Sequence, residues 1–133
     1  MRITIGGIVG VVVTFIIIGV IEALSHVIYP PDPSVNWRDP IQFAANIDLV
    51  EIPAMIMVAF AHFVGIIGGN IVAKLITKGS KIPGYIIGGL ILTGTIINLI
   101  WIPHPTWFAV TDVIAVLIAF WLGMKIAKKR QKA

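Results

Sequence analysis

The sequence predicts an all-α integral membrane protein, a four-transmembrane-helix up-down bundle with a short interfacial helix in its first outer loop. Three observations predict this class. Hydrophobic residues make up 58% of the 133-residue chain and charged residues only 12%, a far more apolar balance than that of soluble domains. A chain this short could not bury so much apolar surface in water. Four apolar segments also reach the length of about 20 residues that a helix needs to cross a bilayer.

The four apolar segments form one transmembrane domain over residues 1–133. The predicted helices span about residues 3–28, 50–77, 83–102 and 107–127, with an outer loop, 29–49, after the first and a cytoplasmic basic tail, 128–133, after the last. A membrane β-barrel is excluded because the turn-separated alternation of its strands is missing. The first segment is too long for a cleaved signal peptide, and Glu22 interrupts the place of the cleavage site, so we expect a retained helix. The chain has no cysteine, which excludes disulfides and thiolate metal sites.

The basic residues predict how the chain lies in the membrane. Nine of the ten flank the inner ends of the predicted helices, and only Arg38 lies in the outer loop. The positive-inside rule then places both termini in the cytoplasm and the protein in the cytoplasmic membrane, the inner membrane of a bacterium. We interpret the basic tail as an anchor of this topology that also attracts anionic lipid, and we expect no nucleic-acid partner because the basic run is short.

Prolines and acids shape the outer loop. Its first prolines prevent regular structure, and Asp39 and Pro40 then supply an N-cap followed by proline at the first helical position. They predict a short helix over about 40–46 that would lay Ile41 and Phe43 on the membrane surface. Asp48 is predicted to cap the second membrane helix. The other two connections are short, so consecutive helices are expected to lie antiparallel and side by side.

Small residues at four-residue spacing predict close helix packing. They are Ala61, Gly65, Gly69 and Ala73 in the second segment and Gly6, Gly10 and Thr14 in the first. Such residues let membrane helices approach closely, within the bundle or between protomers. Because so little of the chain lies outside the bilayer, we expect contact with lipid and either a homo-oligomer or a partner membrane subunit.

Ionisable residues within the membrane segments are the main candidates for function, because they are costly in a bilayer. Glu22 and His26 lie four residues apart and share one helix face near the outer end of the first helix. His104 lies in the outer turn between the last two helices. If the first helix contacts that turn, the three form a ligand-binding or metal site, and two imidazoles with a carboxylate suit zinc or iron. The alternative is that these groups only pair with one another or with lipid headgroups.

Four further residues are predicted to form a supporting polar network: Asn98, Asp112, His62 and Glu51. Each also has a structural interpretation. Glu51 has the spacing of a capping box at the start of the second helix. Asn98 is expected to form an interhelical hydrogen bond, and Asp112 to pair across the bundle with Asn98 or a protonated Glu22. For His62, near the middle of the second helix, the expected partner is a backbone carbonyl or a hydroxyl.

Two motifs resemble those of a group of small bacterial four-helix membrane proteins. The first is E-x-x-x-H-x-x-Y-P-P, from Glu22 to Pro31, and the second is P-H-P-x-W-F, from Pro103 to Phe108. The layout is similar over nearly the whole chain, whereas the motifs cover only the two outer junctions. The resemblance supplies no catalytic residues. It implies that the end of the first helix and the outer turn are the signature features of the group.

The function that these residues favour is a ligand- or partner-binding site in the outer leaflet, in a subunit of a larger membrane complex. A metal-dependent membrane enzyme using Glu22, His26 and His104 is one alternative. No phosphate-binding loop or zinc-protease motif points to an enzyme, and no catalytic residue is predicted. A small proton-coupled transporter is the other alternative. Against it, Asn70 is the only polar residue besides lysine in the inner half of the second helix.

Overall fold

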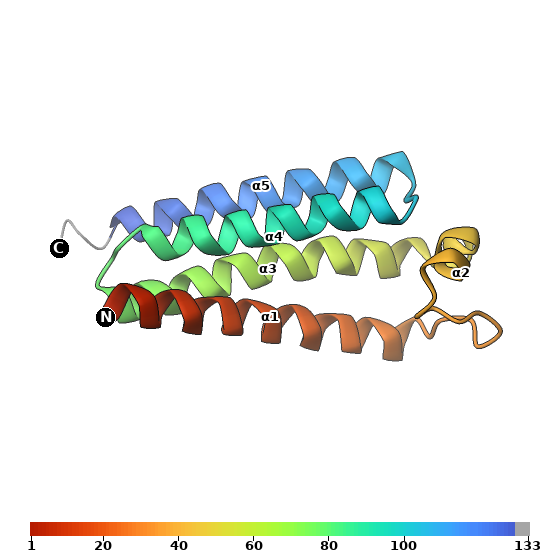
Figure 1. Cartoon of the computed structure of the whole chain (residues 1–133), viewed down its shortest axis with the longest axis horizontal. Coiled ribbons are helices and arrows are strands. Elements are labelled where there is room, and N and C mark those ends of the chain that lie inside the picture. The colour runs from red at the N-terminus through yellow and green to blue at the C-terminus, as the bar shows by residue number, and fades with distance from the viewer. Residues whose placement is uncertain (130–133) are drawn as a thin grey trace.

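The computed structural model describes residues 1–129, and helices are the only regular elements in that range (Figure 1). The elements are α1 (Arg2–Ile28), α2 (Pro40–Ala45), the 3-10 helix η1 (Ile47–Leu49), α3 (Ile52–Thr77), α4 (Ile82–Trp101) and α5 (Thr106–Lys129). Four of them, α1, α3, α4 and α5, are long and apolar enough to cross a membrane. Their ends differ from the predicted ones by two residues or fewer. Most of the predicted basic tail, 128–133, lies outside the described residues.

The four long helices lie along one axis (Figure 1). The N-terminus and the end of α5 lie at one end of the bundle, here the terminal end, and α2 lies at the other, here the α2 end. Contact is most extensive between α1 and α3 and then between α3 and α5, while α4 contacts all three other long helices. The two helix ends that carry the candidate residues, those of α1 and α4, therefore both lie at the α2 end.

Small residues bring α1 and α3 close together, as the glycine spacing predicts. A methyl group at Gly69 would overlap Thr14 and the backbone of Gly10, and one at Gly65 would overlap Ile18. The Thr14 hydroxyl donates to the Gly10 carbonyl at 2.8 Å, so this buried polar group is satisfied within its own helix. Close backbone contact of this kind drives helix association where lipid surrounds the protein.

The outside of the bundle is apolar. Large hydrophobic side chains such as Phe15, Phe60 and Trp121 are exposed along the long helices, while the core contains Ile66 and Val116 with other aliphatic side chains. Soluble monomers rarely expose contiguous apolar surface of this extent. The surface therefore suits hydrocarbon rather than water.

Local hydrogen bonds shape the segment between α1 and α3. The Asp39 carboxylate accepts from the Ile41 N–H at 2.9 Å and caps α2. The prediction that Asp48 caps α3 is wrong, because Asp48 lies inside η1 and Glu51 takes the N-cap position without a side-chain hydrogen bond. Pro53 in the first turn has no N–H, so α3 begins with one donor fewer to satisfy.

The loop before α2 folds back on itself. Ser34 donates to the Asp32 carboxylate from its hydroxyl at 2.6 Å and from its N–H at 2.8 Å. These bonds hold the pKa of Asp32 below its ordinary value. The Trp37 ring N–H donates to the Asp32 carbonyl at 2.7 Å, and Trp37 meets Phe43 of α2 edge-on, with ring centroids 5.4 Å apart. The loop thereby fixes two aromatic rings at the α2 end.

The turn between α3 and α4 is tight. The φ angle is 55° at Lys78 and 99° at Gly79, so the chain leaves α3 through left-handed backbone, which glycine adopts without strain. The Gly79 N–H donates to the Lys74 carbonyl at 3.2 Å, and Pro83 lies in the first turn of α4. This turn lies at the terminal end, far from the candidate residues.

Candidate functional site

A cavity of about 620 Å³ lies at the α2 end of the bundle. Five of the predicted residues line it: Glu22, His26, Glu51, Asn98 and His104. They come from α1, from the residue before α3, from α4 and from the turn between α4 and α5. Residues far apart in the sequence meet here because the helix ends that carry them lie at one end of the bundle (Figure 1). Acidic, amide and imidazole groups thus surround a single cavity.

The cavity does not assemble the predicted metal triad of Glu22, His26 and His104. Within residues 1–129, no group of three His, Cys, Asp or Glu side chains lies close enough together to hold a metal ion. Glu22 is half-buried and His26 is exposed. The three side chains share a cavity but not a coordination sphere, so the geometry does not support zinc or iron at this position.

His104 is held in place by its neighbours. Its Nδ1 lies 2.7 Å from the Ile102 carbonyl oxygen, which can only accept, so Nδ1 carries the hydrogen. In the neutral ring, Nε2 is then left as an acceptor. The ring stacks on Phe108 of α5 with centroids 5.0 Å apart and also lies near Phe43 of α2. His104 therefore links α2 to α5 and, when neutral, keeps one ring nitrogen available to accept a hydrogen bond.

Aromatic and basic residues that were not predicted as site residues complete the cavity wall, and one of them, Phe43, lines the cavity although it was expected on the membrane surface. Trp37, Arg38 and Phe43 come from the loop and α2, and Phe108 comes from α5. A signal for Arg38 was present in the sequence, because it is the only basic residue between α1 and α3. In the sequence, the charge of Arg38 bears only on the predicted orientation. Its contribution to the cavity depends on how the loop folds, which composition does not reveal.

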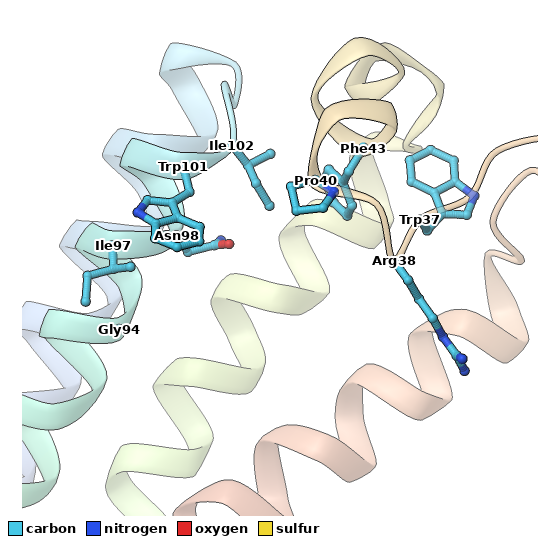
Figure 2. A pocket seen from close by; sticks show the side chains of 9 residues that line it. All are labelled: Trp37, Arg38, Pro40, Phe43, Gly94, Ile97, Asn98, Trp101 and Ile102. Atoms are coloured by element: carbon cyan, nitrogen blue, oxygen red, sulfur yellow. The ribbon is translucent and has the colours of Figure 1, made fainter.

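A smaller groove of about 380 Å³ adjoins the cavity (Figure 2). Both spaces are lined by Trp37, Arg38, Phe43 and Asn98, so they are contiguous. The rest of the groove wall comes from α4, the residue after it and the start of α2: Gly94, Ile97, Trp101, Ile102 and Pro40. Figure 2 shows the Arg38 side chain pointing away from α4 and toward α1. The groove therefore extends the cavity along the outside of α4.

A buried hydrogen-bonded pair lies one helical turn beneath the cavity wall. His62 of α3 follows the wall residue Val58 by four positions, and Asp112 of α5 follows Phe108 by four. His62 Nδ1 lies 2.8 Å from Asp112 Oδ1, and the two side chains are 15% and 1% exposed. The pair thus joins α3 to α5 inside the bundle, directly below the space that a ligand would fill.

This pair corrects two expectations from the sequence. Asp112 bonds to His62 rather than to Asn98 or Glu22, and His62 bonds to a carboxylate rather than to a backbone carbonyl or hydroxyl. The reason is packing. Because α3 and α5 contact each other extensively, their facing polar side chains meet, whereas Asn98 and Glu22 line the cavity.

The pair is suited to holding a proton in the interior of a membrane. When the pair holds one added proton, it is neutral overall whether that proton lies on the imidazole or on the carboxyl group, and buried charges are tolerated only with such a partner. Asp112 Oδ2 and Thr95 Oγ1 are buried and have no hydrogen-bond partner among the described residues. Buried polar atoms without partners are uncommon, so the site keeps unused hydrogen-bonding capacity.

Two further polar residues are buried in α3 toward the terminal end. Asn70 and Lys74 follow His62 by eight and twelve residues. The Asn70 side chain donates to a carbonyl of its own helix at 2.8 Å and packs against Gly84 of α4 and Gly123 of α5. The buried Lys74 makes the half of α3 nearer the terminal end more polar inside the bundle than Asn70 alone would.

The motif resemblance to small bacterial four-helix membrane proteins stays a prediction. No protein-family model, curated protein or solved structure matches the chain.

Proposed function

We propose that this polytopic membrane protein binds a small amphiphilic ligand in its cavity at the α2 end, within the outer leaflet of the cytoplasmic membrane. The observation that carries the proposal is the cavity, about 620 Å³ in volume, where a few polar groups stand in a largely apolar and aromatic wall. Small-molecule sites usually have a volume of about 300–1,000 Å³ and this mixture of lining groups. Four helices able to cross a membrane support the location.

Charge supports an orientation in which the α2 end faces outward and both termini lie in the cytoplasm. Lys78 and Lys81 lie in the turn at the terminal end, whereas Arg38 is the one basic residue between α1 and α3. We further propose that α2 lies on the membrane surface. In its support, Ile41 is 80% exposed, and Trp101 is a typical interfacial residue at the same end. Assembly with a second copy or a partner subunit stays a prediction of the sequence.

Filling the cavity tests the ligand-binding proposal. Ala54 lines the cavity on α3, whereas Ala45 at the end of α2 is exposed and does not line it. The full chain is released from its native membrane into mild detergent and analysed by native mass spectrometry for bound non-protein mass. We expect wild type and Ala45→Phe to retain an adduct that Ala54→Phe loses. An adduct retained by all three proteins, or missing from wild type, would overturn the proposal.

The buried His62–Asp112 pair favours a second function, proton-coupled transport of the ligand. Ionisable groups in the interior of a membrane protein commonly belong to ion or proton pathways. This pair lies one turn below the cavity wall, and the buried Asn70 and Lys74 lie farther along α3 toward the terminal end. A proton-binding group between a ligand cavity and the opposite membrane face is what such a transporter requires.

Proton flux tests this second function. The protein is reconstituted in liposomes made from the total lipid of its native membrane, with a pH-sensitive dye inside and an imposed pH gradient. We expect flux in wild type and in Asp32→Asn, which changes an exposed loop residue, and none in Asp112→Asn. If wild type carries no flux across a range of gradients, transport is excluded and the binding function stands alone.

A further inference from the structure

We propose that the occupant of the cavity is a phospholipid with an amine-bearing, zwitterionic headgroup, which enters sideways from the bilayer between α1 and α4. The inference rests on the proposed function and names its ligand class and route. It is carried by the contact between α1 and α4, by the groove that continues the cavity, and by the charges on the cavity wall.

The helices α1 and α4 touch toward the terminal end and enclose the cavity at the α2 end. At the terminal end, Gly10 of α1 lies so close to Ile87 of α4 that a methyl group at Gly10 would overlap it. Farther along the same two helices, Glu22 and Asn98 both line the cavity. The space between α1 and α4 is therefore closed at the terminal end and open at the α2 end.

The groove on α4 gives this opening a wall that faces lipid. Ile97 is 49% exposed and Trp101 is 73% exposed, and Gly94 has open space where a side chain would stand. Because groove and cavity share four residues (Figure 2), a headgroup in the cavity would leave its acyl chains against Gly94 and Ile97. The ligand thus reaches the cavity from the membrane rather than from water.

The charges on the cavity wall match a zwitterion. Besides the imidazoles and Tyr29, the ionisable groups on the wall are the Arg38 guanidinium and the carboxyl groups of Glu22 and Glu51. Within residues 1–129, none of the three forms an ion pair with another side chain. A phosphodiester would pair with Arg38. An ammonium group would pair with Glu22, with the face of the Trp37 ring as a further contact for a cation.

Lipids of other charge fit this wall less well. A lipid with net negative charge satisfies Arg38 but brings its charge close to two carboxylates, and like charges brought together are costly. An amphiphile that carries only a cation leaves Arg38 without a partner. A headgroup with one phosphate and one amine satisfies both signs at once.

Binding of defined lipids tests the headgroup. The delipidated full chain is titrated in detergent with phosphatidylethanolamine, phosphatidylglycerol or soluble phosphoethanolamine and followed by native mass spectrometry. We expect phosphatidylethanolamine to bind about tenfold more tightly than phosphatidylglycerol, the effect of one charge-assisted contact. Glu22→Gln should remove most of this preference, and Asp32→Asn, whose side chain lies outside the cavity wall, should retain it.

Two glycines of α4 test the route. Gly94 and Gly89 are both exposed and have open space around them, but only Gly94 lines the groove. We expect Gly94→Leu to weaken phosphatidylethanolamine binding by about tenfold and Gly89→Leu to leave it unchanged. Equal effects of the two substitutions, or phosphoethanolamine binding as tightly as the lipid, would overturn entry from the membrane.

The outcomes separate this inference from the proposed function. If phosphatidylglycerol binds as tightly as phosphatidylethanolamine, the zwitterionic headgroup is wrong. If Ala54→Phe removes a native adduct that is not a phospholipid, the cavity is a binding site and the lipid assignment falls. If Ala54→Phe changes no adduct at all, the proposed function falls with it.

Discussion

Asp112 and His62 show how single residues combine packing with chemistry in this bundle. The Asp112 carboxylate is 1% exposed, and one of its oxygens meets the His62 ring at 2.8 Å. A carboxylate in such surroundings depends on its partner, because removing one member of a buried pair leaves the other charge uncompensated. The pair therefore holds α3 against α5 beneath the cavity, whether or not it also carries protons.

Removing the imidazole should destabilise the protein strongly. We expect His62→Ala to lower the free energy of unfolding by roughly 3–5 kcal/mol, because it leaves the Asp112 carboxylate buried without a partner. Asp112→Asn should cost less, since the amide oxygen can still accept from His62 Nδ1. Denaturant unfolding in detergent measures both. His26→Ala is the control because His26 is exposed, and a His62→Ala protein as stable as this control would contradict the account.

At the scale of elements, the two ends of α1 have different surroundings. Gly6, Gly10 and Thr14, nearer the terminal end, fit against α3, while the last turns of α1, with Glu22 and His26, border the cavity. Such an arrangement places polar groups at the edge of the bundle without breaking the contact that fixes the helix. The close contact with α3 thus holds α1 in the position in which its last turns border the cavity.

Enlarging a glycine in this contact should separate α1 from α3. Gly69→Val would overlap Thr14 and the Gly10 backbone, and we expect a loss of about 1–3 kcal/mol or more, the usual cost of overpacking. Gly19→Val is the matched control, because a side chain there meets nothing within 4 Å. Thermal unfolding in detergent compares the two, and equal melting temperatures would show that the contact is not tight.

The sequence predicts elements better than contacts in this protein. Segment length and apolar composition gave the four long helices, and Asp39 with Pro40 indicated α2, because these signals are local. The partner of Asp112 was predicted wrongly because it depends on which faces of α3 and α5 meet. Arg38 was missed as a wall residue because the fold of its loop places it there. The sequence indicated Glu22, His26 and His104 as polar residues that are costly in a membrane. It could not predict how far apart their side chains lie.

At the scale of the whole molecule, the proposed binding of an outer-leaflet ligand depends on which end of the bundle faces outward. The wall of the cavity, the loop before α2 and α2 itself all lie at one end, and the N-terminus lies at the other (Figure 1). The asymmetry of basic residues predicts that the cavity end faces away from the cytoplasm. A ligand of the outer leaflet requires this orientation.

Cysteine labelling checks the orientation, because the chain has no cysteine of its own. Ser34 lies in the loop before α2, and Ser80 lies in the turn between α3 and α4. In intact cells, we expect a membrane-impermeant maleimide to label Ser34→Cys and to label Ser80→Cys only after the membrane is permeabilised. The reverse pattern would place the cavity on the cytoplasmic side and contradict the proposed leaflet.

The central claim is that the cavity between α1 and α4 holds a ligand from the membrane. The most direct measurement is an experimental density map of the full chain purified together with its native lipid. The account predicts non-protein density between Glu22 and Asn98, continuing along Gly94 on the outside of α4. A map in which α1 closes against α4 at the α2 end, with no space between these residues, would contradict it.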